Sequence, residues 1–133
     1  MNERTFCDSN VLLYLFDQDV AKKRVATDIL KGGTIIHPQV ICEVANVLKR
    51  RFKLDKKSVV EAVKDMMTFC DCVPATEETL KSAFKLIDRY DFQFFDAIIV
   101  AGALESDCTI LYSEDMHYNL LVEKQLRILN PFL

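Results

Sequence analysis

Short apolar segments alternate with longer segments of helical periodicity along all 133 residues. Strands joined by helices of this length form βαβ units, in which the strands are parallel and the crossovers right-handed. The alternation predicts an α/β fold, a three-layer α/β/α sandwich around a central parallel sheet of roughly five strands. The predicted strands span residues 4–7, 34–36, 70–74, 109–112 and 127–129.

The helices between these strands are predicted from apolar residues three and four positions apart and from capping residues. Residues 94–104 are nearly all apolar, which predicts a central helix that is buried on every side. No repeat, linker or low-complexity stretch interrupts the pattern, so we expect a single domain over residues 1–133. The predicted helices span residues 10–16, 20–30, 38–52, 55 or 58 to 69, 76–90 and 94–104.

The net charge of the chain limits the kinds of molecule that it can bind. The chain has 17 lysines and arginines and 20 aspartates and glutamates, a formal net charge of -3. A strongly basic nucleic-acid binder is excluded, and a nucleic acid would have to be contacted through a local basic patch. No apolar stretch is long enough to span a bilayer, and the N-terminus does not resemble a secretory signal. We therefore expect a cytoplasmic protein that does not act at a membrane.

The cysteines are odd in number and lack the spacing of a disulfide framework or a zinc site. We interpret them as small buried apolar residues with free thiols in a reducing compartment. They are Cys7, Cys42, Cys70, Cys72 and Cys108.

Four carboxylates lie at special positions in the predicted fold. Asp8 directly follows the first strand, and Asp115 follows the strand at residues 109–112. Glu43 and Asp96 each interrupt an otherwise apolar helical pattern. The carboxyl ends of parallel strands share one edge, where α/β sheets gather ligands. Four carboxylates in one pocket cannot all be ionised without a cation, so the pattern favours a divalent metal and chemistry on phosphate.

Each of these acids also has a structural interpretation of its own. Asp8 fits a helix N-cap, and Asp96 fits the positive end of a helix dipole. Asp115 fits a solvated loop, and Glu43 could reach solvent at the rim of the fold, since burying it unpaired is costly. Their coincidence at one edge of the sheet is what favours a shared site. Polar neighbours could orient the carboxylates, although their residue types are also typical of turns. These neighbours are Ser9, Asn10 and Ser113.

One dense basic cluster stands out in this acidic chain. It comprises Lys49, Arg50, Arg51 and Lys53, with Lys56 and Lys57 close behind. Such a cluster could contact the phosphates of a nucleic acid. It could equally be a helix C-terminus whose dipole favours cations, followed by a solvated turn.

Several segments together resemble a PIN domain, in particular the VapC toxins of bacterial and archaeal toxin–antitoxin pairs. The resemblance extends from residue 6 to about residue 130, and its two later segments are the specific ones. Asp107 departs from the pattern, because relatives often have glycine there, but this affects only a turn. The segments that carry the resemblance are residues 8–12, Glu43 in its helix, residues 95–105 and residues 111–116.

The resemblance implies a metal-dependent endoribonuclease that hydrolyses RNA phosphodiester bonds. Asp8, Glu43 and Asp96 match the family's ligands for Mg²⁺ or Mn²⁺, and Asp115 matches a fourth acid of more variable role. Asn10 and Ser113 match supporting polar positions of the family, and the basic cluster becomes a candidate RNA contact.

The resemblance also implies partners. We expect a homodimer and a cognate VapB-like antitoxin that covers the acidic groove. The apolar helices around residues 40–48 and 59–67 could carry a partner surface or could be ordinary core.

Other families with an acidic pocket fit less well. A haloacid-dehalogenase-like phosphatase needs a second aspartate at position 10, where this chain has Asn10. A response-regulator receiver needs paired N-terminal acids and a lysine at a strand end, and neither is present. Two alternatives stay open within the resemblance: an RNA-processing nuclease without an antitoxin, and a non-catalytic PIN-like binding module.

Overall fold

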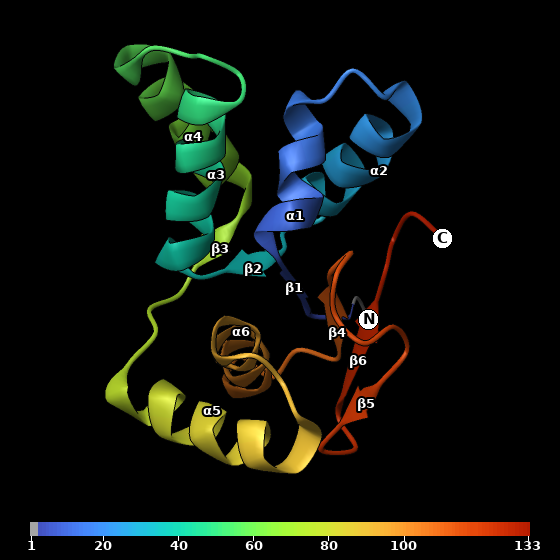
Figure 1. The fold of residues 1–133 in the computed structure, drawn as a ribbon. Coiled ribbons are helices and arrows are strands. Elements are labelled where there is room, and N and C mark those ends of the chain that lie inside the picture. The colour runs from blue at the N-terminus through green and yellow to red at the C-terminus, as the bar shows by residue number, and fades with distance from the viewer. Residues whose placement is uncertain (1–2) are drawn as a thin grey trace.

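A computed structural model describes residues 3–133 and places a six-stranded sheet at the centre of the molecule (Figure 1). The strand order is β3-β2-β1-β4-β6-β5, and the first five strands in that order are parallel to one another. The predicted α/β sandwich with a central parallel sheet is therefore confirmed. The strands are β1 Thr5–Cys7, β2 Ile35–Ile36, β3 Asp71–Cys72, β4 Ile110–Tyr112, β5 Leu121–Val122 and β6 Leu126–Leu129.

The sixth strand, β5, was not predicted from the sequence. It pairs antiparallel with β6, and Glu123 and Lys124 in the connecting turn both have positive φ. A two-residue strand without a glycine or proline in its turn gives no pattern that distinguishes it from a loop.

The helices agree with the sequence prediction to within a few residues. The first one begins as an α-helix and continues as a 3-10 helix, a common form for short terminal turns. Thr76 caps its helix through reciprocal bonds with Thr79, because each residue's hydroxyl accepts from the other's backbone N–H at 3.3 and 2.9 Å. The elements are α1 Ser9–Leu12, η1 Leu13–Phe16, α2 Val20–Lys31, α3 Pro38–Arg50, α4 Lys56–Phe69, α5 Glu77–Tyr90 and α6 Phe94–Glu105.

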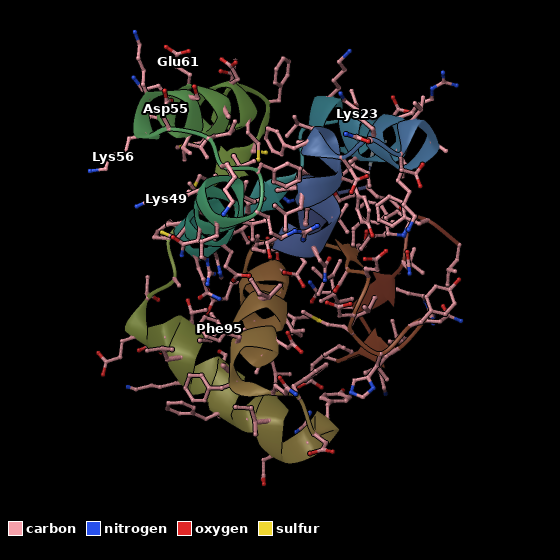
Figure 2. All side chains as sticks on the ribbon, turned by 45° about the horizontal axis from the view of Figure 1, so that its top comes forward. Lys23, Lys49, Asp55, Lys56, Glu61 and Phe95 are labelled. Atoms are coloured by element: carbon pink, nitrogen blue, oxygen red, sulfur yellow. The ribbon has the colours of Figure 1, made fainter. Side chains whose placement is uncertain are left out.

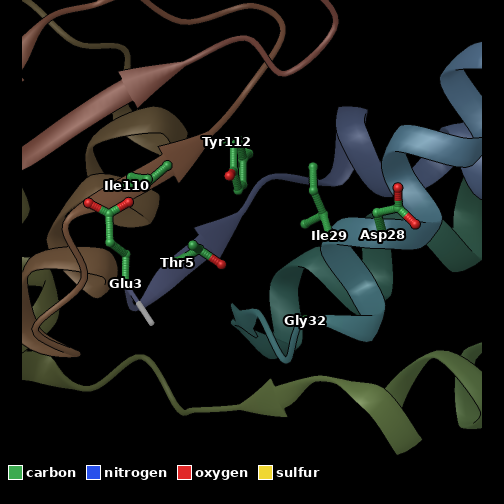
Figure 3. Close-up of a pocket in the computed structure, with 7 residues that line it drawn as sticks. All are labelled: Glu3, Thr5, Asp28, Ile29, Gly32, Ile110 and Tyr112. Carbon is green, nitrogen blue, oxygen red and sulfur yellow. The ribbon is translucent and has the colours of Figure 1, made fainter. Parts of the chain in front are cut away.

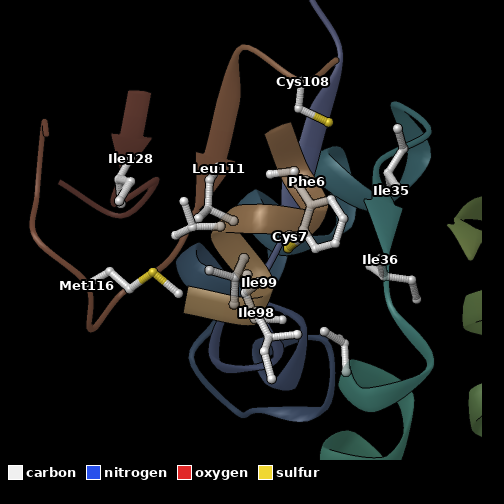
Figure 4. Packing of buried hydrophobic residues seen from close by; sticks show 14 of the residues in the cluster. Phe6, Cys7, Ile35, Ile36, Ile98, Ile99, Cys108, Leu111, Met116 and Ile128 are labelled. Atoms are coloured by element: carbon white, nitrogen blue, oxygen red, sulfur yellow. The ribbon is translucent and has the colours of Figure 1, made fainter. Parts of the chain in front are cut away.

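Helices cover both faces of the sheet. Figure 1 shows α1 to α4 on one side and α5 with α6 on the other. Residues 97–103 of α6 are buried without interruption, which confirms the predicted central helix over that part. Phe94 and Phe95, also predicted to be buried, are more than half exposed, because the first turn of α6 lies at the surface. Ile98 and Ile99 of this helix belong to the same buried cluster as Phe6 of β1 and Leu111 of β4 (Figure 4).

A close approach of two elements fixes the position of α6. His37, the residue before α3, is fully buried with its ring 5.0 Å from that of Phe6. A Cβ at Gly102 would lie 2.1 Å from two ring atoms of His37. Burial lowers the pKa of His37, and neither ring nitrogen has a hydrogen-bond partner among the described residues. The helix that carries Asp96 is thus packed directly against the start of the helix that carries Glu43.

The cysteines of the described chain are free thiols, as predicted. Cys7 and Cys108 are buried, but Cys42 is exposed on α3, which corrects the expectation that the cysteines are buried. Within residues 3–133 no helix has the length and apolar character needed to cross a membrane.

Candidate active site

The carboxyl ends of β1 and β4 open onto a pocket of about 310 Å³ that brings the four predicted carboxylates together. Each acid comes from a different part of the chain: the end of β1, helix α3, helix α6 and the loop after β4. Their convergence follows from parallel pairing, because β1 and β4 end at the same edge. The pocket is lined by Asp8, Ser9, Asn10, Gln39, Glu43, Phe95, Asp96, Ile99 and Asp115.

Asp8 is both a helix cap and a wall of this pocket. Its Oδ1 accepts a hydrogen bond from the Ser9 backbone N–H at 2.8 Å, and its Oδ2 accepts one from Ser113 Oγ at 3.0 Å. Burial raises the pKa of Asp8 to about 6, against the effect of these two hydrogen bonds. The charges of Glu43 and Asp96 are smaller causes of the same rise in pKa. The protein therefore holds Asp8 where a negative charge is costly without a nearby cation.

Glu43 is held by two neutral donors. Ser9 Oγ donates to Glu43 Oε2 at 2.7 Å, and Gln39 Nε2 donates to Glu43 Oε1 at 3.4 Å. Gln39 lies one turn before Glu43 on α3, so its side chain can reach the same face of the helix. These contacts set the direction of the Glu43 carboxylate toward the pocket that it lines.

Asp96 lies in the first turn of α6, where the helix dipole favours a negative charge. Burial nevertheless raises the pKa of Asp96, and the charges of Asp115 and Glu43 raise it further, while His117 lowers it. Burial and the neighbouring carboxylates therefore disfavour the charged form of Asp96.

Asn10 ties the loop after β4 to helix α1. Its Nδ2 donates to Asp115 Oδ2 at 3.2 Å and to Ser113 Oγ at 3.4 Å. Its Oδ1 accepts from the backbone N–H of Glu114 at 3.1 Å. Asn10 and Ser113 thus position Asp8 and Asp115, the supporting arrangement that the sequence predicts for them.

The carboxylate oxygens that line the pocket are possible metal ligands, but they are not arranged as a complete coordination shell. Among residues 3–133, no three His, Cys, Asp or Glu side chains form a group that could hold a metal ion as they stand. Asp8 and Glu43 are instead engaged by hydroxyl and amide donors. Hard carboxylate oxygens are the ligand type that Mg²⁺ and Mn²⁺ prefer, so the chemistry of the donor set fits such an ion.

A larger pocket of about 540 Å³ lies elsewhere, between α2 and strands β1 and β4. Its two acids, Glu3 and Asp28, lie on opposite sides, and neither converges with the other polar groups (Figure 3). Convergent polar groups with shifted pKa values mark a functional site better than volume does. The smaller acidic pocket is therefore the candidate active site.

A family model described as the PIN domain matches residues 5–121. The chain is a member of the PIN domain family. No curated protein was found to match the sequence.

Two solved structures share the fold of this PIN domain. VapC20 of Mycobacterium tuberculosis, a toxin that cleaves the sarcin–ricin loop, has a TM-score of 0.65 at 19% identity over 84% of this chain and 89% of that one. A toxin–antitoxin complex from Klebsiella pneumoniae has a TM-score of 0.71 at 18% identity over 96% and 97%.

The basic cluster of this PIN domain lies beside the acidic pocket. Lys49, labelled in Figure 2, and Arg50 occupy the last turn of α3. Lys49, Arg50, Arg51 and Lys53 are all exposed. Within residues 3–133, none of the four forms a salt bridge. Arg51 lines a small pocket that shares Asn10 with the acidic pocket. The cluster thus occupies a helix C-terminus, and its residue Arg51 lines a pocket next to the candidate active site.

Three lining residues of the acidic pocket were not predicted from the sequence: Gln39, Phe95 and Ile99. Gln39 could have been found from its position one turn before Glu43, a spacing that places both side chains on one face. Phe95 and Ile99 could not, because they belong to an apolar run in which nothing distinguishes the pocket residues from the core residues.

Proposed function

We propose that this PIN domain is a metal-dependent endoribonuclease that hydrolyses RNA phosphodiester bonds and acts as the toxin of a VapBC-type toxin–antitoxin pair. The observation that carries the proposal is the convergence of Asp8, Glu43, Asp96 and Asp115 on one pocket of a PIN fold. The raised pKa values of Asp8 and Asp96 support it, because a bound cation would relieve the repulsion that causes part of each shift.

Asp8 and Asp96 would hold the main Mg²⁺ or Mn²⁺ ion, with Asp115 completing a second, weaker site. Such an ion, when bound, polarises a phosphoryl oxygen and lowers the pKa of a coordinated water. Glu43 would contribute a ligand or position the attacking water, since Ser9 and Gln39 already orient its carboxylate. Ser113 and Asn10 would keep the oxygens of Asp8 and Asp115 directed into the pocket.

The toxin assignment rests on the fold shared with VapC20 and with the Klebsiella complex. With this assignment we also propose a cognate VapB-like antitoxin, a homodimer and a cytoplasmic location. Helix α4 offers a partner surface, because three of its apolar side chains are about half exposed: Val60, Met67 and Phe69. The apolar residues Val40 and Val44 of α3 belong to the core.

Cleavage of RNA by the purified protein tests the nuclease directly. We expect internal cuts in RNA when Mg²⁺ or Mn²⁺ is present and no cuts when the ion is removed with EDTA. Sequencing of the new ends after induced expression identifies the target. RNA binding without metal-dependent cleavage of any RNA would instead identify a binding module.

The toxin part of the proposal needs a separate measurement. Induced expression should arrest growth, and co-expression of the protein from the neighbouring reading frame should restore it. Cleavage without growth arrest would identify an RNA-processing nuclease that has no antitoxin.

Neutralising the basic cluster should weaken RNA binding. With Lys49, Arg50 and Arg51 replaced by glutamine, the slope of log affinity against log salt should fall by about 2, since each single-strand phosphate contact contributes about 0.7. The matched control replaces Lys23, Arg24 and Lys31, three exposed cations of α2, and changes the net charge equally. Equal slopes for the two triple variants would make the cluster a structural feature only.

A further inference from the structure

Phe95 is an exposed aromatic residue in the wall of the acidic pocket. Its side chain is 62% exposed, although the seven residues from Ala97 to Ala103 of the same helix are buried. It lies outside the hydrophobic core and directly precedes Asp96 (Figure 2). Most of this side chain stays in contact with solvent, so the fold gains little from burying it.

The neighbouring Phe94 provides a comparison. Phe94 is also about half exposed, but its ring packs against that of Phe84 with centroids 5.8 Å apart. Phe94 is not a lining residue of the acidic pocket. Phe95 has no aromatic partner within residues 3–133, so its ring remains available on the pocket side.

We infer that the Phe95 ring is a stacking platform for one unpaired base of the RNA, beside the phosphate that is cut. This inference rests on the proposed nuclease function and assigns a substrate-binding role to a further residue of the same pocket. Every base has a π-face, but a base in a duplex already uses it to stack on its neighbours. The substrate must therefore present a single-stranded segment or a loop in which a base can turn onto Phe95.

The chemistry of the pocket favours this role for Phe95. The acidic wall repels a nucleotide strand wherever no cation intervenes, and Phe95 and Ile99 are the apolar members of its described lining. A neutral aromatic ring can stack on a base without repelling the negatively charged phosphates. Because Phe95 and Asp96 are consecutive on α6, a base on the ring belongs to a nucleotide that flanks the phosphate at the carboxylates.

The absence of tryptophan from the chain allows a direct test. Phe95→Trp introduces the only fluorophore of its kind, and a stacked base quenches it. The probes are an unstructured RNA oligonucleotide and the same RNA annealed to its complement, mixed rapidly in Mg²⁺ and recorded before cleavage. We expect quenching by the single strand, little by the duplex, and little by either in the matched control Phe94→Trp.

Truncation gives the second readout. Phe95→Ala should weaken single-strand affinity about 5- to 150-fold, the range of one base–aromatic stack, whereas Phe95→Tyr should retain it. Equal affinity of Phe95→Ala and wild type overturns the inference, as does a Phe95→Trp signal that follows protein concentration instead of RNA, which would indicate contact between two copies of the chain. If the wild type cleaves RNA while the tryptophan signal stays constant, only the platform fails. Quenching without Mg²⁺-dependent cleavage by the wild type overturns the nuclease and keeps the platform.

Discussion

Asp96→Asn is expected to abolish metal-dependent RNA cleavage and to leave the fold intact. The substitution keeps the size of the side chain but removes a charged oxygen ligand from the first turn of α6. Loss of residues that merely support metal ligands costs about 10- to 100-fold, so loss of a ligand should exceed about 100-fold. The measurement is the cleavage rate of one RNA substrate in saturating Mg²⁺ or Mn²⁺.

Asp8→Asn should have the same effect on cleavage but a further effect on stability. The folded pKa of about 6 lies above the ordinary value of 3.8, so the folded protein binds more protons than the unfolded chain between those values. In the metal-free protein, this group's contribution to stability is therefore greatest below about pH 4 and is lost as the pH rises through about 6. Asparagine at position 8 carries no negative charge. The free energy of unfolding of Asp8→Asn should therefore exceed that of wild type by at most about 3 kcal/mol at pH 7.

Thermal unfolding in EDTA at pH 5 and pH 7.5 checks this stability effect, and Asp88→Asn on the exposed face of α5 is the matched control. The control should keep both the cleavage rate and the pH dependence of wild type. Full activity in Asp8→Asn or Asp96→Asn would rule out the assignment of these residues.

Gly102→Ala should destabilise the fold by about 3 kcal/mol or more, although alanine is the better helix former by about 1 kcal/mol. The new Cβ would meet the His37 ring at 2.1 Å. His37 is fully buried against Phe6, so its ring can move away only by displacing core side chains. For a domain of this size the melting temperature should fall by roughly 10 °C, measured by circular dichroism or calorimetry.

A double variant separates this clash from a general effect on the helix. His37→Ala removes the ring, so Gly102→Ala should cost little or nothing in that background. The double variant should therefore lose much less stability than the sum of the two single losses. Additive losses would show that the two residues do not meet in the folded protein.

The sequence allowed the fold to be predicted because strong local patterns agreed with it. The apolar run at residues 94–104 predicted the buried helix, and helices separate the first four strands along the chain, β1 to β4. The β5–β6 hairpin was missed because its turn contains Glu123 and Lys124 in positive-φ conformations instead of glycine. The exposure of Cys42 was missed because composition cannot say which face of α3 meets the core.

The site was predictable only as far as topology determines it. Parallel strands bring Asp8 and Asp115 to one edge, which the sequence pattern implied. Asp8 caps helix α1 and also lines the acidic pocket, so its structural role is compatible with the proposed role in metal binding. The contact of His37 with Gly102 and the exposure of Phe95 depend on how α6 is rotated and packed, and no local pattern encodes that.

Diffraction from a crystal soaked in Mn²⁺, recorded at the manganese absorption edge, would locate the ion without reference to activity. We predict an anomalous peak in the acidic pocket, bonded to carboxylate oxygens of Asp8 and Asp96, and its loss in Asp96→Asn. A peak elsewhere on the molecule, or an empty pocket at a Mn²⁺ concentration that supports cleavage, would contradict the metal-dependent nuclease.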